Sequence, residues 1–155
     1  MKKQNSLRSI MRGRVVLFGI GSLLKSDDAA GPLLVERLKG RVTASCINAE
    51  NAPERFFGEA LRAHPDTLLI IDAVHLGEEP GSYRLLRPEE LTGSGITTHD
   101  IPLGELLELF TKESGVDIWV LGIQPERLEI AEGLSSRVQK TVDELEKLLI
   151  EAAPQ

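Results

Sequence analysis

The stretch Leu68-Leu69-Ile70-Ile71-Asp72 decides the fold of this 155-residue chain. Four consecutive apolar residues are typical of a β-strand covered on both faces, as in a parallel sheet with helices above and below it. A carboxylate is seldom tolerated inside such a sheet. Asp72 is therefore expected just past the strand end, in the crevice where α/β proteins bind ligands. From the sequence alone, capping of a loop explains Asp72 about equally well.

Strands and helices alternate on both sides of this central strand. The other expected strands are 15–18, 42–47, 82–86 and 118–123. The expected helices run from Asp27 or Asp28 to Gly40, from Pro53 to His64, from Pro102 onward and from about Ser135 onward. This alternation predicts an α/β fold in three layers: a twisted, mostly parallel five-stranded sheet with helices on both faces.

The length predicts one domain, because domains usually hold roughly 100–200 residues. We assign residues 15–155 to a single α/β domain. Residues 1–14 carry five positive charges and no acidic residue, and we expect them to form a flexible basic leader. The leader lacks the apolar run of a signal peptide, and the apolar runs are too short to span a bilayer. The expected setting is the reducing cytoplasm.

Charge and residue content exclude several classes of function. The formal net charge is −6, which disfavours binding to nucleic acid or to an anionic membrane. A single cysteine, Cys46, can form neither an intrachain disulfide nor a multi-cysteine zinc site. The three histidines are His64, His75 and His99. Metal or acid/base chemistry must therefore use these histidines together with the carboxylates.

The turn after the first strand, residues 19–28, does not fit a nucleotide site. A G-x-G-x-x-G pattern would need glycine at position 24, where the chain has leucine. The adjacent carboxylates Asp27 and Asp28 would also repel a phosphate from the start of the helix. Aspartate at this place typically caps a helix. One aspartate is enough for capping, which leaves the other to point into the crevice.

His99 lies in the polar loop before the helix that begins at Pro102. A histidine hydrogen-bonded within its loop is the simpler interpretation. His64 looks structural, and His75 is a reserve candidate because it follows Asp72 by three residues.

One of the aspartates Asp27 and Asp28, together with Asp72 and His99, comes from three strand ends that could meet at one edge of the sheet. Two carboxylates and one imidazole would bind a borderline divalent ion reversibly, unlike a tight structural zinc site. The residues alone leave a metal-dependent hydrolase and a binding module open.

Six short motifs occur here in the order and spacing of one protein family. They are Asp27-Asp28-Ala29-Ala30-Gly31-Pro32, Ala52-Pro53-Glu54, Ile70-Ile71-Asp72-Ala73, Pro80-Gly81, Thr97-Thr98-His99-Asp100-Ile101-Pro102-Leu103 and Leu121-Gly122-Ile123-Gln124-Pro125. With these motifs the chain resembles the nickel–iron hydrogenase maturation endopeptidases, in particular the branch that processes hydrogenase-3 (formate hydrogenlyase) large subunits.

The resemblance implies a cytoplasmic endopeptidase of the aspartyl type. It would remove the C-terminal extension of the hydrogenase large-subunit precursor after nickel insertion. The family's metal-binding residues correspond to Asp28, Asp72 and His99, which are also the catalytic candidates. They would bind nickel supplied by the substrate, weakly or transiently. The family fold, a twisted five-stranded sheet flanked by helices, agrees with the fold expected from the strand pattern.

Two positions depart from the family pattern. Ser22 replaces the usual asparagine of the glycine turn, and Asn48 stands where the family often has aspartate. An aspartate at position 48 therefore cannot act here, although Glu50 could supply a nearby carboxylate.

Two alternatives to a protease follow from the same residues. One is a nickel-dependent docking or sensing chaperone that holds the large subunit without cutting it. The other is a flavodoxin-like structural module in which every acidic group is a cap.

Overall fold

The computed structural model describes residues 2–92, 97–98 and 102–152. Its centre is a sheet with the strand order β2-β1-β3-β6-β4, and β5 pairs with β3 outside this path. The strands are β1 (Val15–Gly19), β2 (Ser45–Asn48), β3 (Thr67–His75), β4 (Tyr83–Leu86), β5 (Thr97–Thr98) and β6 (Asp117–Ile123). β1, β2, β3 and β6 are parallel, and β4 is antiparallel to β6. The predicted mostly parallel five-stranded sheet is confirmed, and β5 is a short addition to it.

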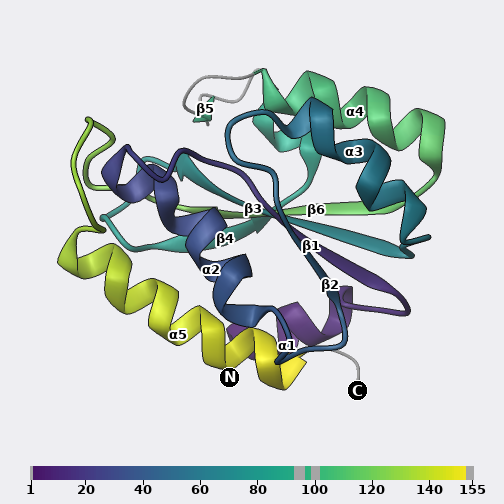
Figure 1. The fold of residues 1–155 in the computed structure, drawn as a ribbon, viewed down its shortest axis with the longest axis horizontal. Helices are drawn as coiled ribbons and strands as arrows, with labels where there is room; N and C mark the ends of the chain where they lie inside the picture. The colour runs from purple at the N-terminus through teal and green to yellow at the C-terminus, as the bar shows by residue number, and fades with distance from the viewer. Residues whose placement is uncertain (1, 93–96, 99–101, 153–155) are drawn as a thin grey trace.

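Helices cover both faces of the sheet (Figure 1). They are α1 (Lys2–Ile10), α2 (Ala30–Leu38), α3 (Pro53–Arg62), α4 (Leu103–Ser114), α5 (Ser136–Ala152) and the 3-10 helices η1 (Ser26–Ala29) and η2 (Pro88–Leu91). One core joins the sheet to α1, α2 and α5, and a second core joins the opposite face to α3 and α4. The three layers are those expected from the sequence.

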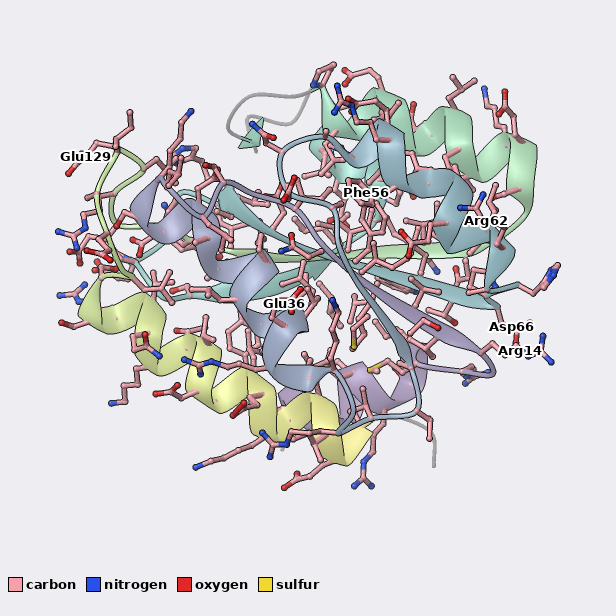
Figure 2. All side chains as sticks on the ribbon, in the orientation of Figure 1. Arg14, Glu36, Phe56, Arg62, Asp66 and Glu129 are labelled. Atoms are coloured by element: carbon pink, nitrogen blue, oxygen red, sulfur yellow. The ribbon has the colours of Figure 1, made fainter. Side chains whose placement is uncertain are left out.

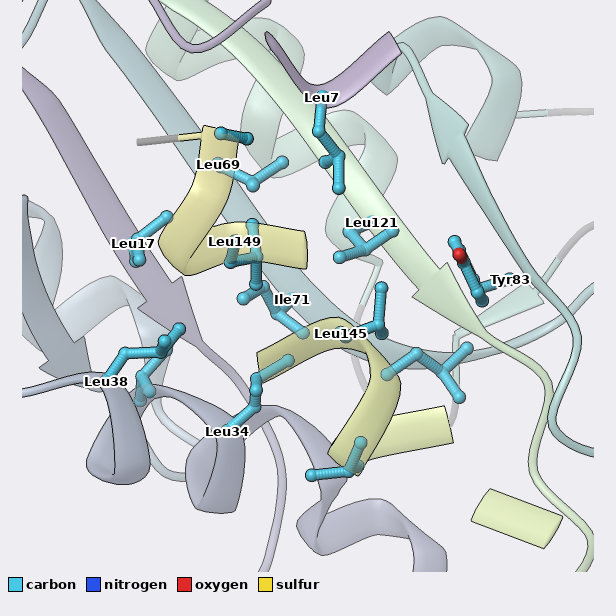
Figure 3. Packing of buried hydrophobic residues seen from close by; sticks show 14 of the residues in the cluster. Leu7, Leu17, Leu34, Leu38, Leu69, Ile71, Tyr83, Leu121, Leu145 and Leu149 are labelled. Carbon is cyan, nitrogen blue, oxygen red and sulfur yellow. The ribbon is translucent and has the colours of Figure 1, made fainter. Parts of the chain in front are cut away.

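The continuous apolar run of β3 serves both cores. Leu69 and Ile71 pack in the core with α5, as Figure 3 shows, whereas Leu68 and Ile70 pack in the core with α3 and α4. Alternate residues of a strand point to opposite faces, so a central strand without polar residues is what a three-layer fold requires.

Part of the segment expected to be a flexible leader is folded. Residues 2–10 form α1, and Leu7, Ile10 and Met11 are buried in the same core as α5. The spacing of these three residues places them on one face of a helix, which packs against the domain. The hydroxyl of Thr67 also donates a hydrogen bond to the carbonyl oxygen of Ile10 (3.2 Å). The sequence prediction gave too much weight to the charges and too little to this spacing.

The predicted end of the central strand was wrong. β3 continues beyond Ile71 to His75, so Asp72 lies inside the strand and pairs with Gly122 of β6. The strand is extended because β6 continues beside it to Ile123 and β5 pairs with its last two residues. On its other side, β1 ends at Gly19, opposite Ile71. Asp72 is thus the first β3 residue beyond the end of β1.

Among the helices in the described part of the chain, none is both long enough and apolar enough to cross a membrane.

Candidate active site

The site forms where β1 leaves the sheet and the chain turns into η1 and α2. The N–H of Ile20 donates to the carbonyl oxygen of Ile71 (2.9 Å), which holds the start of the turn against β3. Gly31 of α2 lies on the same carbonyl group: a Cβ atom added there would be 2.2 Å from the Ile71 oxygen. This absence of a side chain allows α2, and η1 before it, to approach β3 next to Asp72.

The carboxylate of Asp28 is held by the glycine turn. Its side chain is buried, and Oδ2 accepts a hydrogen bond from the N–H of Ser22 (2.8 Å). Gly21 has φ +146°, and a Cβ atom on it would clash with the Asp28 carbonyl oxygen, so the turn requires glycine here. The replacement of asparagine by Ser22 does not affect this bond, because the donor is a backbone group.

Asp72 brings a second buried carboxylate to the same edge of the sheet. Asp28 and Asp72 are each only 4% exposed. Their elements, η1 and β3, are in contact. Burial of a carboxylate is costly, and such groups gather at functional sites. The structure thus brings together the elements of two of the three predicted site residues.

The third predicted residue, His99, lies outside the described residues. The strand before it is described: Thr97 pairs with His75 and Thr98 pairs with Val74 in the antiparallel β5–β3 ladder. Thr98, the last described residue before position 99, therefore pairs with the β3 residue two positions beyond Asp72. Within the described residues no group of three or more His, Cys, Asp or Glu side chains is arranged to hold a metal ion. The metal role of Asp28, Asp72 and His99 stays a prediction.

The other two histidines are exposed. His64 follows α3 with a positive φ of 51°, as expected for a residue that ends a helix. His75 is the last residue of β3.

Asp27, which the sequence treats only as a helix cap, has a different role. Its fully buried carboxylate accepts hydrogen bonds from the N–H groups of Glu126 (2.9 Å) and Arg127 (3.1 Å) and from the N–H (2.7 Å) and hydroxyl (2.8 Å) of Ser135. It makes no capping bond to η1 or α2. Asp27 therefore anchors a distant loop, and Asp28 remains the aspartate of the candidate site.

Gln124 is a second structural residue that the sequence did not reveal. Its buried side chain accepts a hydrogen bond at Oε1 from the N–H of Leu76 (2.6 Å) and donates from Nε2 to the carbonyl oxygen of Pro125 (3.1 Å). The bond from Leu76 joins the ends of β3 and β6. The only signal in the sequence was the position of glutamine directly after a buried strand.

The segment around Asn48 supports the glycine turn. Asn48 Oδ1 accepts the N–H of Glu50 (3.0 Å), and the Glu50 carbonyl oxygen accepts the N–H of Gly21 (2.7 Å). Glu50 has a positive φ of 52°, and its side chain is exposed. The backbone of Glu50 thus holds the glycine turn, and a catalytic role for its carboxylate stays a prediction.

Cys46 is not suited to nucleophilic catalysis. It lies half-buried in β2, where burial raises the pKa of its thiol to about 11. A thiol with such a pKa is protonated at neutral pH and is a poor nucleophile. This agrees with the sequence interpretation, which gave Cys46 no role.

Comparison with known proteins gives one consistent result. The family model for HycI, the hydrogenase maturation protease, matches residues 32–152. The hydrogenase 3 maturation protease of Escherichia coli K12 is 33% identical over 114 residues, which is 72% of each chain. The hydrogenase 2 maturation protease of the same organism is 29% identical to this chain over 140 residues, which is 84% of each chain.

Solved structures agree with the sequence relatives. A crystal structure of HycI from Thermococcus kodakarensis superposes with a TM-score of 0.85 at 30% identity, covering 95% of this chain and 97% of that one. The solution structure of the Escherichia coli endopeptidase HycI gives a TM-score of 0.77 at 27% identity, covering 87% and 88%. The chain therefore belongs to the hydrogenase maturation protease family and is an endopeptidase of that family.

Proposed function

We propose that this protein removes the C-terminal extension of a nickel–iron hydrogenase large-subunit precursor after nickel has been inserted. The observation that carries the proposal is the burial of two carboxylates, Asp28 and Asp72, on contacting elements at one edge of the sheet. In a family of maturation proteases, such carboxylates are the natural candidates for substrate recognition and chemistry.

In this proposal the nickel belongs to the substrate, and Asp28, Asp72 and His99 bind it only while the precursor is docked. Two carboxylates and one imidazole form a mixed oxygen and nitrogen ligand set, which suits reversible binding of a borderline ion. The bond from the Ser22 N–H orients the Asp28 carboxylate in advance. Contact with the nickel would place the scissile peptide beside the site and lower the entropic part of the barrier.

The chemistry is hydrolysis of one peptide bond. A carboxylate takes a proton from water while the water oxygen attacks the scissile carbonyl carbon. The C–N bond then breaks, and the proton is delivered to the leaving amine. Polarisation of the scissile carbonyl by the substrate's nickel is the alternative way to activate the same bond.

Incubation of the purified protein with nickel-loaded precursor tests this function, with the precursor mass as the readout. We expect the wild type to shorten the precursor, and Asp28→Asn, Asp72→Asn and His99→Ala each to abolish shortening while the fold is retained. Asp143→Asn is the matched control, because Asp143 is exposed on α5 and should leave the rate unchanged.

Each outcome of this experiment decides one point. Full cleavage by His99→Ala would show that the predicted trio is wrong. Binding of the precursor by the wild type without any shortening would favour the docking chaperone. The cytoplasmic location is also a proposal, and cell fractionation with immunoblotting would test it.

A further inference from the structure

The loop between β6 and α5, residues 124–135, is anchored firmly although it contains no helix or extended strand. Besides the four bonds to Asp27, the N–H of Asp27 donates to the carbonyl oxygen of Arg127 (3.2 Å). Ser26 contributes two bonds, from its N–H to the Ala131 oxygen (3.0 Å) and from its hydroxyl to the Gly133 oxygen (3.0 Å). Long loops fixed in this way commonly have a function.

This anchoring places exposed apolar side chains from two separate segments together. A parallel bridge joins Lys25 to Ala131, and the N–H of Ala131 donates to the carbonyl oxygen of Leu24 (3.2 Å). The backbone of Leu24 therefore lies beside the backbone of Ile130 and Ala131. Leu24 is 74% exposed and Ile130 is 81% exposed.

Leu23, which is 49% exposed, extends the same surface. We define Leu23, Leu24 and Ile130 as the apolar patch. Five large hydrophobic residues are exposed among those that the structure describes, and the patch contains three of them. Single exposed apolar residues need no explanation, but a group of them marks an interaction surface.

The apolar patch is continuous with the candidate active site. Ser22, whose N–H binds the Asp28 carboxylate, directly precedes Leu23 in the chain. The hydroxyl of Ser22 in turn accepts the N–H of Leu24 (3.2 Å). A protein that places a peptide at Asp28 would therefore lie over Leu23 and Leu24.

The loop that carries Ile130 has more acidic than basic side chains. Glu126, Glu129 and Glu132 are exposed on the loop, and Figure 2 shows Glu129 pointing outward from it. Arg127 is the only cation in the loop sequence, and its Nε donates to the Ser26 hydroxyl (2.8 Å) at the base of the loop. With Lys25 included, the loop carries three negative and two positive charges next to the patch in sequence.

We propose that the apolar patch is the docking surface for the hydrogenase large-subunit precursor. The contacting surface of that precursor would be apolar at its centre and basic at its edge, complementary to the patch and its glutamates. This inference rests on the proposed function, because the occupant is the substrate named there. Docking at the patch would hold the folded body of the precursor while its C-terminal segment reaches Asp28 and Asp72.

Steady-state cleavage of nickel-loaded precursor by Leu24→Glu and Ile130→Glu tests the proposal. Both positions are exposed, so the variants should melt at the temperature of the wild type. We expect KM to rise roughly tenfold or more and kcat to stay unchanged, since the patch would contact the body of the precursor and not the scissile peptide. The matched controls Leu61→Glu on α3 and Leu109→Glu on α4 carry the same change at exposed leucines, and their KM should equal that of the wild type.

The acidic side chains of the loop are tested separately with the variant Glu129→Gln/Glu132→Gln. Raising the salt concentration from about 50 mM to about 300 mM should raise KM for the wild type more than for this variant, because screening weakens attraction between exposed charges. If salt raises KM equally for the wild type and this variant, the proposal that the precursor's contacting surface has a basic edge is overturned.

Failure of the docking proposal and failure of the proposed function give different results. If the wild type shortens the precursor and both patch variants keep its KM, the docking proposal is overturned. If the wild type does not shorten the precursor at all, the proposed function fails, and the docking proposal fails with it. If the wild type is a dimer that Leu24→Glu converts to a monomer with unchanged KM, the patch is an interface between copies of this chain, which also overturns docking.

Discussion

The carboxylate of Asp27 accepts two hydrogen bonds from Ser135, one from its N–H and one from its hydroxyl, although 108 positions separate the residues in sequence. The same carboxylate binds the N–H groups of Glu126 and Arg127. One buried side chain therefore fixes both ends of the 124–135 loop to η1. The adjacent Asp28 accepts a hydrogen bond from the glycine turn, so the two neighbouring aspartates bind different parts of the chain.

Replacement of Asp27 by asparagine should destabilise the protein. Oδ2 of Asp27 accepts three of the four hydrogen bonds, and Oδ1 accepts the fourth. In asparagine one of these two oxygens is replaced by an NH₂ group, which cannot accept a hydrogen bond. Whichever way the amide is oriented, its NH₂ group therefore faces an N–H donor. We expect Asp27→Asn to lower the free energy of unfolding by about 2–4 kcal/mol, measured by urea denaturation.

Asp28→Asn is the matched comparison for this experiment. Its amide oxygen can still accept the Ser22 N–H, so the free energy of unfolding should change by less than about 1 kcal/mol while precursor cleavage is lost. Equal destabilisation by the two substitutions would contradict the division of roles between the aspartates.

Gly31 should tolerate no side chain. A methyl group there would meet the Ile71 carbonyl oxygen at 2.2 Å and would move α2 and η1 away from β3. We expect Gly31→Ala to lower the free energy of unfolding by about 1–3 kcal/mol and to reduce cleavage, because Asp28 moves relative to Asp72. Urea denaturation and initial rates of precursor cleavage measure the two effects.

Gly58→Ala provides the control for this substitution. Gly58 lies in α3, and the nearest atom to an added Cβ is the Arg62 Nη1 at 3.6 Å. Alanine favours helix, so stability should be unchanged or higher by up to about 1 kcal/mol. A Gly31→Ala protein as stable and active as Gly58→Ala would show that the close approach of α2 is not required.

Helix α1 should contribute to the stability of the domain. Leu7 is 1% exposed in the core shared with α5, so Leu7→Ala removes buried methyl groups and leaves a cavity. We expect a loss of about 2–4 kcal/mol in the free energy of unfolding. Arg8→Ala, an exposed change in the same helix, should cost less than about 0.5 kcal/mol. Identical urea midpoints for the two variants would show that α1 is not part of the cooperative unit.

Cys46 should react slowly with thiol reagents. Burial raises its pKa from 9.0 to about 11, which at pH 8 reduces the thiolate fraction roughly a hundredfold. Alkylation by iodoacetamide should therefore be slow in the folded protein and fast in denaturant. An alkylation rate in the folded protein equal to that of the denatured chain would contradict this pKa.

The raised pKa of the Cys46 thiol also makes the free energy of unfolding depend on pH. The folded pKa lies above the unfolded one, so the contribution of the thiol to stability is complete below about pH 9 and is lost as the pH rises toward 11. Relative to Cys46→Ala, the wild type should lose stability over this interval. Urea denaturation of both proteins between pH 8 and about 11 measures the difference.

The layers of the fold could be predicted because they depend on local patterns. The apolar run of β3 can be recognised in the sequence, because every residue in it must be buried on one face of the sheet or the other. The length of β3 was not predictable, because it depends on pairing with β5 and β6. For the same reason Asp72 was expected after the strand and is found inside it.

The site was predictable only in part. Asp28 follows β1, and Asp72 lies in the neighbouring parallel strand β3 just beyond the point where β1 ends, so both are at the same edge of the sheet. The role of Asp27 depends on Ser135, a contact that no local pattern encodes. The helical spacing of Leu7, Ile10 and Met11 was present in the sequence but was outweighed by the surrounding positive charges.

The anchoring of the 124–135 loop has a consequence for how these proteases diverge. The bonds from Ser26 and Asp27 to the loop reach its backbone and the hydroxyl of Ser135. Side chains 128–132 take no part in these bonds, so they form a cassette that can be exchanged without altering the scaffold. If the apolar patch docks the precursor as we propose, grafting residues 128–132 between relatives should transfer a preference for one hydrogenase over another and leave Asp28 and Asp72 in place.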